Sequence, residues 1–412
     1  MCEKLTICYN AWMIFNENDD YDDQIFQIAD RGFNCVRIEA GAGLLWDKAG
    51  NVRDDVLISA PFGEYTKYTT YKVIVNKKRL NLMERLLRIC RAAQKHKVKV
   101  VLSSWFFLHT NWYCEEADKR WIYDMSTEEK MSFFADQLSR ILDVLKQENL
   151  IDVVAFAEIF NEFEGLPFAQ NSNKDKELSD MLRCLHEKEI AKLKKHHPDV
   201  LFAYDSVSAY VREEMIPRNI DVLNFHCYYL WPVYEAFEKD LIQFSLEEME
   251  IPDSTRYFLK EQIVTVKEVV EAMDNFRSGL DWPRRISLYL SIDSQKEAAL
   301  TAMLDKELED NFDQYTARFR KGIDKVIATH ATAVPNSKLV MGEGATYCAS
   351  PTLLFERDSE HFWKVLKEQM VYARDKGLWG TVITTTHAPE RSAAWDGCRE
   401  QYRRLNGLFL QD

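Results

Sequence analysis

The 412-residue sequence lacks several features that would place it in a large functional class. It has no uninterrupted apolar run of about 18 residues, so no membrane-spanning helix is expected. It has no basic excess: acidic residues outnumber basic ones 66 to 53, and the net charge of −13 is unsuited to nucleic acid or an anionic membrane. The amino-terminal residues lack the basic segment and apolar stretch of a secretory signal. We therefore expect a cytoplasmic protein with a small neutral or cationic substrate.

Short motifs for metals, cofactors and nucleophiles are also missing. The nine cysteines are scattered and form no C-x-x-C pair, which argues against a zinc knuckle or a redox motif and favours reduced thiols. No G-x-G-x-x-G follows a predicted strand, and neither a P-loop nor a serine nucleophile elbow is present. The sequence therefore predicts an enzyme without a metal or a cofactor.

What the sequence does contain is an alternation of short β-rich apolar segments with helical patterns. Several segments are continuously apolar, as expected for parallel strands that are covered on both faces. Eight such strands in a chain of this length favour a closed (β/α)8 TIM barrel over an open sheet. The predicted strands are 5–10, 34–40, 98–104, 153–159, 200–206, 222–228, 338–344 and 379–385.

Helical patterns fill the gaps between these strands. They cover residues 80–97, 127–149, 174–197 and 358–376. Ser126 is a candidate N-cap, with Glu129 as its capping-box partner, and Gly377 ends the last of these helices.

Two connections are longer than ordinary loops. Residues 41–78 follow the second predicted strand, and residues 229–337 follow the sixth and contain further helices near 256–277 and 295–330. Both lie on the side where barrels place their active sites, so we interpret them as walls of a substrate cleft within one catalytic domain, 1–412.

Two glutamates stand where a barrel places its chemistry, at the carboxyl ends of strands. Glu162 follows the fourth predicted strand and Glu343 ends the seventh. Cleavage of a glycosidic bond needs two carboxyl groups, one protonated and one ionised, that flank the bond. Barrel closure can bring both strand ends to one mouth, although each glutamate could equally be a surface charge or an ion-pair partner.

Four motifs in strand order resemble the retaining clan A glycoside hydrolases, and family 5, the cellulase, mannanase and β-mannosidase group, in particular. The second predicted strand reads Gly32-Phe33-Asn34-Cys35-Val36-Arg37-Ile38, and the fourth ends Ile159-Phe160-Asn161-Glu162. The sixth ends Phe225-His226-Cys227-Tyr228, and the seventh ends Met341-Gly342-Glu343-Gly344. The resemblance covers nearly the whole chain.

The resemblance implies a role for each matching residue. Glu162 would be the acid/base, Glu343 the nucleophile, and Asn161 the partner of the sugar 2-hydroxyl. Arg37 and Tyr228 would orient and ionise the nucleophile, since a guanidinium beside a carboxylate lowers its pKa. His226 would stand near the acid/base. The alternatives are a buried ion pair for Arg37 and a satisfied core histidine for His226.

The sequence departs from the family pattern at the third and eighth strands. Trp105 stands where the family has a histidine, with His109 as a possible substitute. The eighth strand runs into Thr386 and His387 instead of a tryptophan, and Trp395 comes only in the following loop. Because sugar rings stack on aromatic rings, we expect Trp12, Trp105 and Trp395 to be sugar platforms.

We therefore predict a retaining β-glycoside hydrolase for short oligosaccharides, with a β-mannoside or a β-glucoside as the first expectation. The long loops around the mouth favour exo-action. Two alternatives stay open: a non-hydrolytic carbohydrate-binding barrel, and a metal-dependent sugar isomerase or epimerase that uses His109, His226 and His387.

Overall fold

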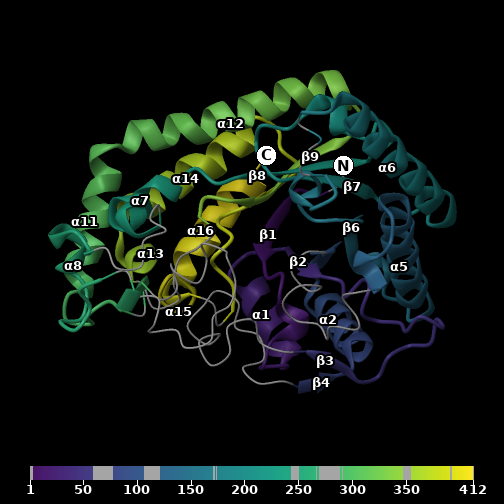
Figure 1. Ribbon diagram of the computed structural model, residues 1–412, viewed down its shortest axis with the longest axis horizontal. Coiled ribbons are helices and arrows are strands. Elements are labelled where there is room, and N and C mark those ends of the chain that lie inside the picture. Colours follow the sequence, from purple (N-terminus) through teal and green to yellow (C-terminus); the bar gives the residue numbers. More distant parts are fainter. Residues whose placement is uncertain are drawn as a thin grey trace.

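The chain folds into a closed barrel of parallel strands that is surrounded by helices (Figure 1). The computed structural model describes residues 3–58, 78–105, 121–169, 172, 174–242, 250–265, 267–268, 288–289, 291–346, 354–389 and 392–411. Around the barrel the strands follow the order β1-β2-β5-β6-β7-β8-β9-β10, and β10 closes the ring on β1. This architecture confirms the predicted (β/α)8 fold.

All eight predicted segments contain a barrel strand. Their buried, mostly apolar residues form the core inside the ring and between the ring and the helices. The strands are β1 Leu5–Tyr9, β2 Cys35–Glu39, β5 Lys99–Ser103, β6 Val154–Glu158, β7 Phe202–Ser206, β8 Val222–Cys227, β9 Lys338–Gly344 and β10 Gly380–Val382.

The outer helices bury one face each against this ring. Ser126 caps the helix that follows it, and a capping box joins it to Glu129 as predicted. Gly377, with a φ of 75°, ends the helix before β10. The helices of the ring are α1 Tyr21–Asp30, α2 Leu82–His96, α5 Thr127–Gln147, α6 Lys176–His196, α12 Phe312–Ala333, α14 Glu360–Asp375 and α16 Arg399–Leu410.

The connection after β2 contains a small hairpin. Strands β3 Val56–Ile58 and β4 Lys78–Leu80 pair antiparallel in it. Residues 59–77 of the predicted 41–78 insertion lie outside the described residues. Its function as a cleft wall stays a prediction.

The connection after β8 contains several helices. It includes α7 Trp231–Ile242, α8 Asp253–Arg256 and α11 Glu297–Asp310, which Figure 1 shows beside α13 Phe355–Asp358. The helix expected near 256–277 is wrong over its first half, because α8 ends at Arg256 and residues 257–265 form turns and isolated β-bridges. Residues 266 and 269–277 lie outside the described residues. The helical pattern expected near 295–330 is present and forms two helices, α11 and α12, which meet at Asn311. Asn311 has φ −116° and ψ 20°, outside the helical values, and both its backbone N–H and its side-chain amide donate to the Glu307 carbonyl, at 3.2 and 3.1 Å.

Within the described part of the chain, no helix is long and apolar enough to cross a membrane. The cysteines that the structure describes are free thiols, and all except Cys184 are buried.

Candidate active site

Arg37 lies at the centre of a buried charged cluster at the carboxyl ends of the strands. It projects from β2, and its side chain is fully buried. One guanidinium nitrogen, Nη2, donates to Glu158 at 2.7 Å, and to Asp205 and Asn161 at 2.9 Å each. The other, Nη1, donates to Glu343. Although burial opposes the charge, these carboxylates raise the pKa of Arg37 well above its ordinary value. Arg37 therefore stays a cation, and its hydrogen bonds join β2 to carboxylates on β6, β7 and β9.

Glu343 reaches this cluster because β9 bulges. The β8–β9 pairing shifts between Phe225 and His226, so one residue of β9 is extra, and that residue is Gly342. A Cβ on Gly342 would lie 2.3 Å from the side-chain oxygen of Asn224, so only glycine fits. Bulges re-aim the side chains beside them. The glycine thus has a packing role in a motif that the sequence alone marked only by resemblance.

The Glu343 carboxylate is held on both oxygens. Oε1 accepts from Arg37 and Oε2 accepts from the Tyr228 hydroxyl. His226 Nε2 lies 3.4 Å from Oε1. Burial raises the pKa of Glu343, while His226 and Arg37 act to lower it. The expected lowering by Arg37 is therefore present, but it is outweighed by burial.

Glu162 differs from Glu343 in its backbone conformation and in the exposure of its side chain. Its backbone is left-handed, with φ 49° and ψ 54°, and its N–H donates to Asp205 Oδ2 at 2.9 Å. Its Oε1 lies 3.0 Å from His226 Nδ1, and its side chain is 21% exposed. Asn161, just before it, is buried with its side-chain oxygen on Arg37. Glu162 is thus the one of the two glutamates that reaches solvent.

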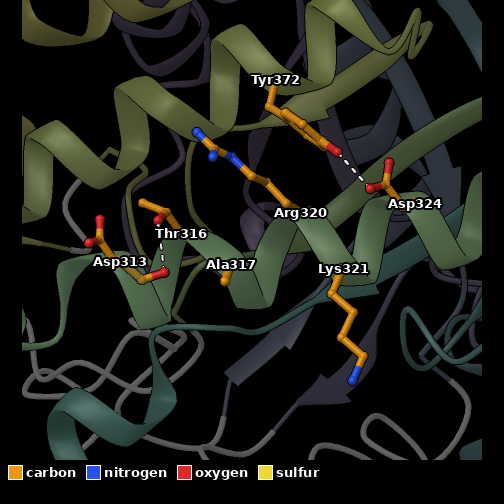
Figure 2. A pocket seen from close by; sticks show the side chains of 7 residues that line it. All are labelled: Asp313, Thr316, Ala317, Arg320, Lys321, Asp324 and Tyr372. Carbon is orange, nitrogen blue, oxygen red and sulfur yellow. Dashed lines mark hydrogen bonds between the residues drawn. The ribbon is translucent and has the colours of Figure 1, made fainter.

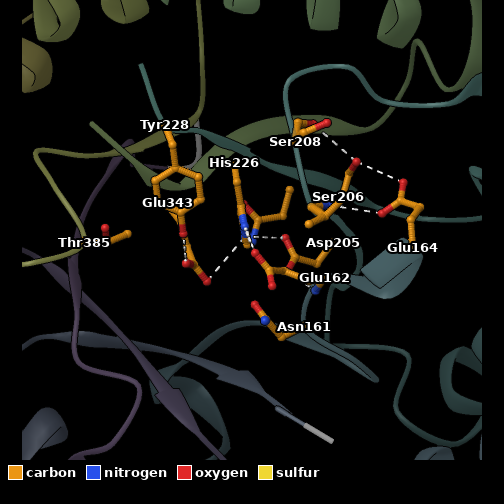
Figure 3. Close-up of polar contacts among 12 residues, drawn as sticks. Asn161, Glu162, Glu164, Asp205, Ser206, Ser208, His226, Tyr228, Glu343 and Thr385 are labelled. Carbon is orange, nitrogen blue, oxygen red and sulfur yellow. Dashed lines mark hydrogen bonds and ion pairs between the residues drawn. The ribbon is translucent and has the colours of Figure 1, made fainter. Parts of the chain in front are cut away.

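His226 lies between the two glutamates (Figure 3). One carboxylate oxygen of Glu162, one of Glu343 and a ring nitrogen of His226 all lie within 4.8 Å of one another. Burial opposes a charged ring, but Asp205 and Glu343 raise the pKa of His226 well above its ordinary value. The structure therefore brings together six residues that the sequence predicted for one site: Arg37, Asn161, Glu162, His226, Tyr228 and Glu343.

Sequence reasoning missed two buried acids of the same cluster. Glu158 accepts from Arg37, from Ser103 and, at 2.7 Å, from Asn224, and burial raises its pKa to about 7. Asp205 contacts Arg37, and burial works against its ionised form, yet His226 and Arg37 hold its pKa below the ordinary value. Both acids stand inside otherwise apolar strand segments. That rarity is the signal that could have found them.

Two of the predicted sugar platforms lie behind Arg37. Trp105 and Trp12 are 2% and 1% exposed, and their rings are tilted against each other at 5.7 Å. The Arg37 guanidinium lies 4.8 Å from the Trp105 ring, and the backbone N–H of Trp105 donates to the Glu39 carboxylate at 2.6 Å. The structure thus makes these rings a buried wall of the charged cluster, without an open face for a sugar.

Trp395 packs far along the barrel from this cluster. It is 1% exposed, stacks on Phe33 at 6.1 Å and lies over the Arg31 guanidinium at 4.3 Å. Phe33 precedes β2, so Trp395 lies toward the amino end of that strand. Among the described residues, its further partners are Gln27 of α1 and Tyr402 of α16, and none of these contacts belongs to the charged cluster around Arg37.

His387 belongs to a second buried network. Its Nε2 lies 2.7 Å from Glu356 Oε2, and its ring packs among Phe362, Trp363 and Tyr402. The structure therefore gives His387 a carboxylate partner away from Glu162 and Glu343. His109 lies outside the described residues.

The donors at the site suit a metal ion poorly. A metal needs a neutral imidazole nitrogen, whereas the raised pKa of His226 favours a protonated ring. Both oxygens of Glu343 already accept from Arg37 and Tyr228. A second trio with suitable spacing lies outside the barrel, on α5 and at the end of α6: Asp143, His196 and His197.

A hollow of about 610 Å³ also lies outside the barrel, on α12 and α14 (Figure 2). Charged and polar side chains line it, and the Tyr372 hydroxyl donates to Asp324 at 2.7 Å there. It is remote from the strand ends that carry the charged cluster. Its lining residues are Asp313, Thr316, Ala317, Arg320, Lys321, Asp324 and Tyr372.

Comparisons with known proteins match the chain to one family and its barrel to several solved structures. A family profile described as sugar-binding cellulase-like matches residues 11–408. A candidate glycoside hydrolase from Parabacteroides distasonis superposes with a TM-score of 0.59 at 16% identity, over 99% of this chain and 93% of its own. The endo-beta-1,4-mannanase from Thermotoga petrophila gives 0.51 at 11% identity, over 99% and 77%.

The cellulose synthase subunit Z from Clostridioides difficile gives a TM-score of 0.50 at 13% identity, over 98% of this chain and 99% of its own. At such identities the likeness concerns the fold. No curated protein matches the chain.

Proposed function

Because the chain belongs to the sugar-binding cellulase-like family, we propose that it is a retaining β-glycoside hydrolase with Glu162 as acid/base and Glu343 as nucleophile. The observation that carries the proposal is the approach of these two carboxylates, whose nearest oxygens lie within 4.8 Å. Retaining enzymes hold the carboxyl groups about 5–5.5 Å apart, whereas inverting enzymes need about 6.5–9.5 Å for an intervening water. The close approach favours direct attack by a carboxylate.

The unlike surroundings of the two glutamates support the division of roles. A nucleophile has to be ionised and fixed in place, and Glu343 is gripped by Arg37 and Tyr228 on its two oxygens. An acid/base has to exchange protons with the leaving group and with water. Glu162 is more exposed, 21% against 5% for the Glu343 side chain.

The reaction then has two displacements. First, a Glu343 oxygen bonds to the anomeric carbon while the glycosidic C–O bond breaks, and Glu162 gives its proton to the departing oxygen. Next, Glu162 takes a proton from a water molecule that attacks the same carbon and releases Glu343. The oxygen of Asn161 is held by Arg37, which leaves its amide nitrogen to donate to the sugar 2-hydroxyl.

The proposed substrates are short β-linked oligosaccharides in the cytoplasm, with a β-mannoside or β-glucoside as the first candidates. Long connections after β2 and β8 would favour exo-action. A panel of nitrophenyl glycosides is the direct test. Turnover of one β-glycoside with a β-configured first product supports the proposal, and an α-configured first product contradicts retention.

Two variants assign the roles. In Glu343→Ala and Glu162→Ala, added azide replaces the missing carboxylate on opposite faces of the sugar. We expect an α-glycosyl azide from Glu343→Ala and a β-glycosyl azide from Glu162→Ala. Glu164→Gln is the matched control, because this neighbouring acid bonds to Ser206 and Val207 instead. The reverse pair of products would exchange the two roles.

The family description, which names sugar binding, favours a second candidate: a barrel that binds a carbohydrate without cleaving it. Such a protein would bind an oligosaccharide in calorimetry and turn over none of the panel. Activity that survives complete chelation of metals would exclude the isomerase alternative.

A further inference from the structure

Asp205, near the carboxyl end of β7, contacts three residues of the candidate active site: Arg37, Glu162 and His226. Its side chain is fully buried. Oδ2 accepts from Arg37 Nη2 and from the Glu162 backbone N–H, each at 2.9 Å. Oδ1 lies 3.1 Å from His226 Nε2, at ion-pair distance.

We propose that Asp205 is the positioning residue of the acid/base: one carboxylate holds both the main chain of Glu162 and the His226 ring that contacts the Glu162 side chain. This inference rests on the proposed glycosidase function and extends it.

The main-chain contact matters because Glu162 has a left-handed backbone. That conformation is unfavourable for a non-glycine residue, so it persists where neighbouring groups hold it. The Asp205 oxygen accepts from the N–H of that residue, and the turn places Asn161 and Glu162 on the same site. A relaxed backbone would redirect both side chains.

The ring contact acts on the other end of Glu162. His226 Nδ1 lies 3.0 Å from Glu162 Oε1, and Nε2 faces Asp205 at 3.1 Å and Glu343 at 3.4 Å. Among the described residues, the Tyr228 ring, just after β8, also lies 5.9 Å from the His226 ring, and Arg37 from β2 pairs with the same Asp205 and Glu343 carboxylates. Asp205 is thus the nearest anion to Nε2 and determines whether that nitrogen carries a proton.

The substitution Asp205→Asn can keep the contacts with Arg37 and the Glu162 N–H while it changes the contact with His226. The asparagine oxygen can accept from Arg37 and the Glu162 N–H, but its amide N–H₂ then faces Nε2, so the two donors conflict unless the ring loses that proton. Glu164→Gln is the matched control: Glu164 joins the same two chain segments, since it accepts from Ser206 Oγ at 3.0 Å and from the Val207 N–H at 3.1 Å. Among the described residues, it contacts neither His226 nor Arg37.

The test compares leaving groups. A phenyl β-glycoside needs the acid to protonate its leaving oxygen, whereas a dinitrophenyl β-glycoside does not. We expect Asp205→Asn to lower kcat/KM for the phenyl glycoside about 100-fold, at the low end of what a positioned acid contributes, and for the dinitrophenyl glycoside less than about 5-fold. Glu164→Gln should change both equally. Equal losses on both substrates in Asp205→Asn would overturn the proposal.

A second measurement needs no activity. In ¹⁵N-labelled wild-type protein at pH 7, with the signals assigned through His226→Asn, both ring nitrogens of His226 should carry protons, and in Asp205→Asn the Nε2 proton should be lost. A wild-type ring with an unprotonated Nε2 overturns the inference, even if the variant does not fold. If the protein cleaves no glycoside, the proposed function fails while this result still decides the role of Asp205.

Discussion

Two buried networks of this barrel each join a glutamate to a histidine, and they differ in their balance of donors and acids. Around Arg37, several carboxylates share one guanidinium and one imidazole, and the pKa values of Glu158 and Glu343 are raised. Around Glu356, a single carboxylate receives Tyr234, Thr346, Thr386 and His387, and despite burial its pKa is lowered by His387 and the hydroxyl donors.

The difference separates a reactive site from a structural one. A buried carboxylate whose oxygens all accept hydrogen bonds is stable in its ionised form. Buried carboxylates that outnumber the nearby cations repel one another, and a bound substrate or an added proton can lower that unfavourable free energy. The Glu356 network joins α7, α13 and the ends of β9 and β10, so it braces the mouth beside the cluster around Arg37.

The largest effect is expected from Glu343→Gln. If Glu343 is the nucleophile, hydrolysis of the best nitrophenyl β-glycoside should fall by about 10⁴-fold or more. Because the substitution also removes one acid from the crowded cluster, the melting temperature should stay equal or rise. A variant with more than about a tenth of wild-type kcat would contradict the nucleophile assignment.

Glu356→Gln should have the opposite profile. Removing the charge from a buried, fully paired carboxylate is expected to lower the free energy of unfolding by about 2–4 kcal/mol, with kcat per folded molecule close to wild type. Urea unfolding at pH 7 measures the loss.

The pH dependence sharpens this prediction. The folded-state pKa of Glu356 lies below 4.5, so its stabilising contribution is present above that pH and is lost as the pH falls through the folded pKa. The acid side of the stability profile should therefore be flatter in Glu356→Gln. A variant with an unchanged profile would show that Glu356 is not the group concerned.

Glu158→Gln tests the crowding of the cluster itself. The folded-state pKa is about 7, against 4.5 for an ordinary glutamate, so the native state binds the extra proton and wild-type stability should fall as the pH rises between these values. Glutamine removes that slope, and Asn224 can rotate its amide to match it. At pH 8 the variant should be more stable than wild type by about 1–3 kcal/mol. A steeper slope in the variant would refute the raised pKa.

The smallest effects compare two glycines. Gly342→Ala puts a methyl group 2.3 Å from Asn224, and an overpacked core typically loses about 1–3 kcal/mol. Activity should fall too, because the bulge places Glu343. Gly377→Ala meets no atom within 4 Å and costs only its left-handed backbone, about 1 kcal/mol, with activity intact. Equal activity losses in both variants would argue against a positioning role for the bulge.

The sequence predicted much of this molecule because the information is local. Mostly apolar segments such as β1 and amphipathic patterns such as α5 each specify one element, and their alternation specifies a barrel. The cluster residues Arg37, Glu162, His226 and Glu343 were predictable as strand-end residues in family order. The break between α11 and α12 at Asn311 was not located from the sequence, since the helical pattern of apolar residues does not mark it.

The sequence also did not specify the direction in which several predicted side chains point. Trp395 and His387 both follow β10, yet the Trp395 indole donates to Gln27 of α1 and His387 pairs with Glu356. Trp12 and Trp105 do lie at the strand ends, but packing on Arg37 buries their faces. Sequence position specifies the distance from a strand end and not the direction in which a ring points.

By itself, the sequence determined the eight strands, the helices α2, α5, α6 and α14 around them, and the order in which Glu162 and Glu343 follow their strands, because periodicity and chain order are properties of the chain. Only the tertiary structure decided which acids share Arg37, that Asp205 holds Glu162 and His226 together, and that His387 belongs to another network. These are contacts between residues far apart in sequence, and burial and barrel closure specify them by bringing charges out of water and into one another's reach.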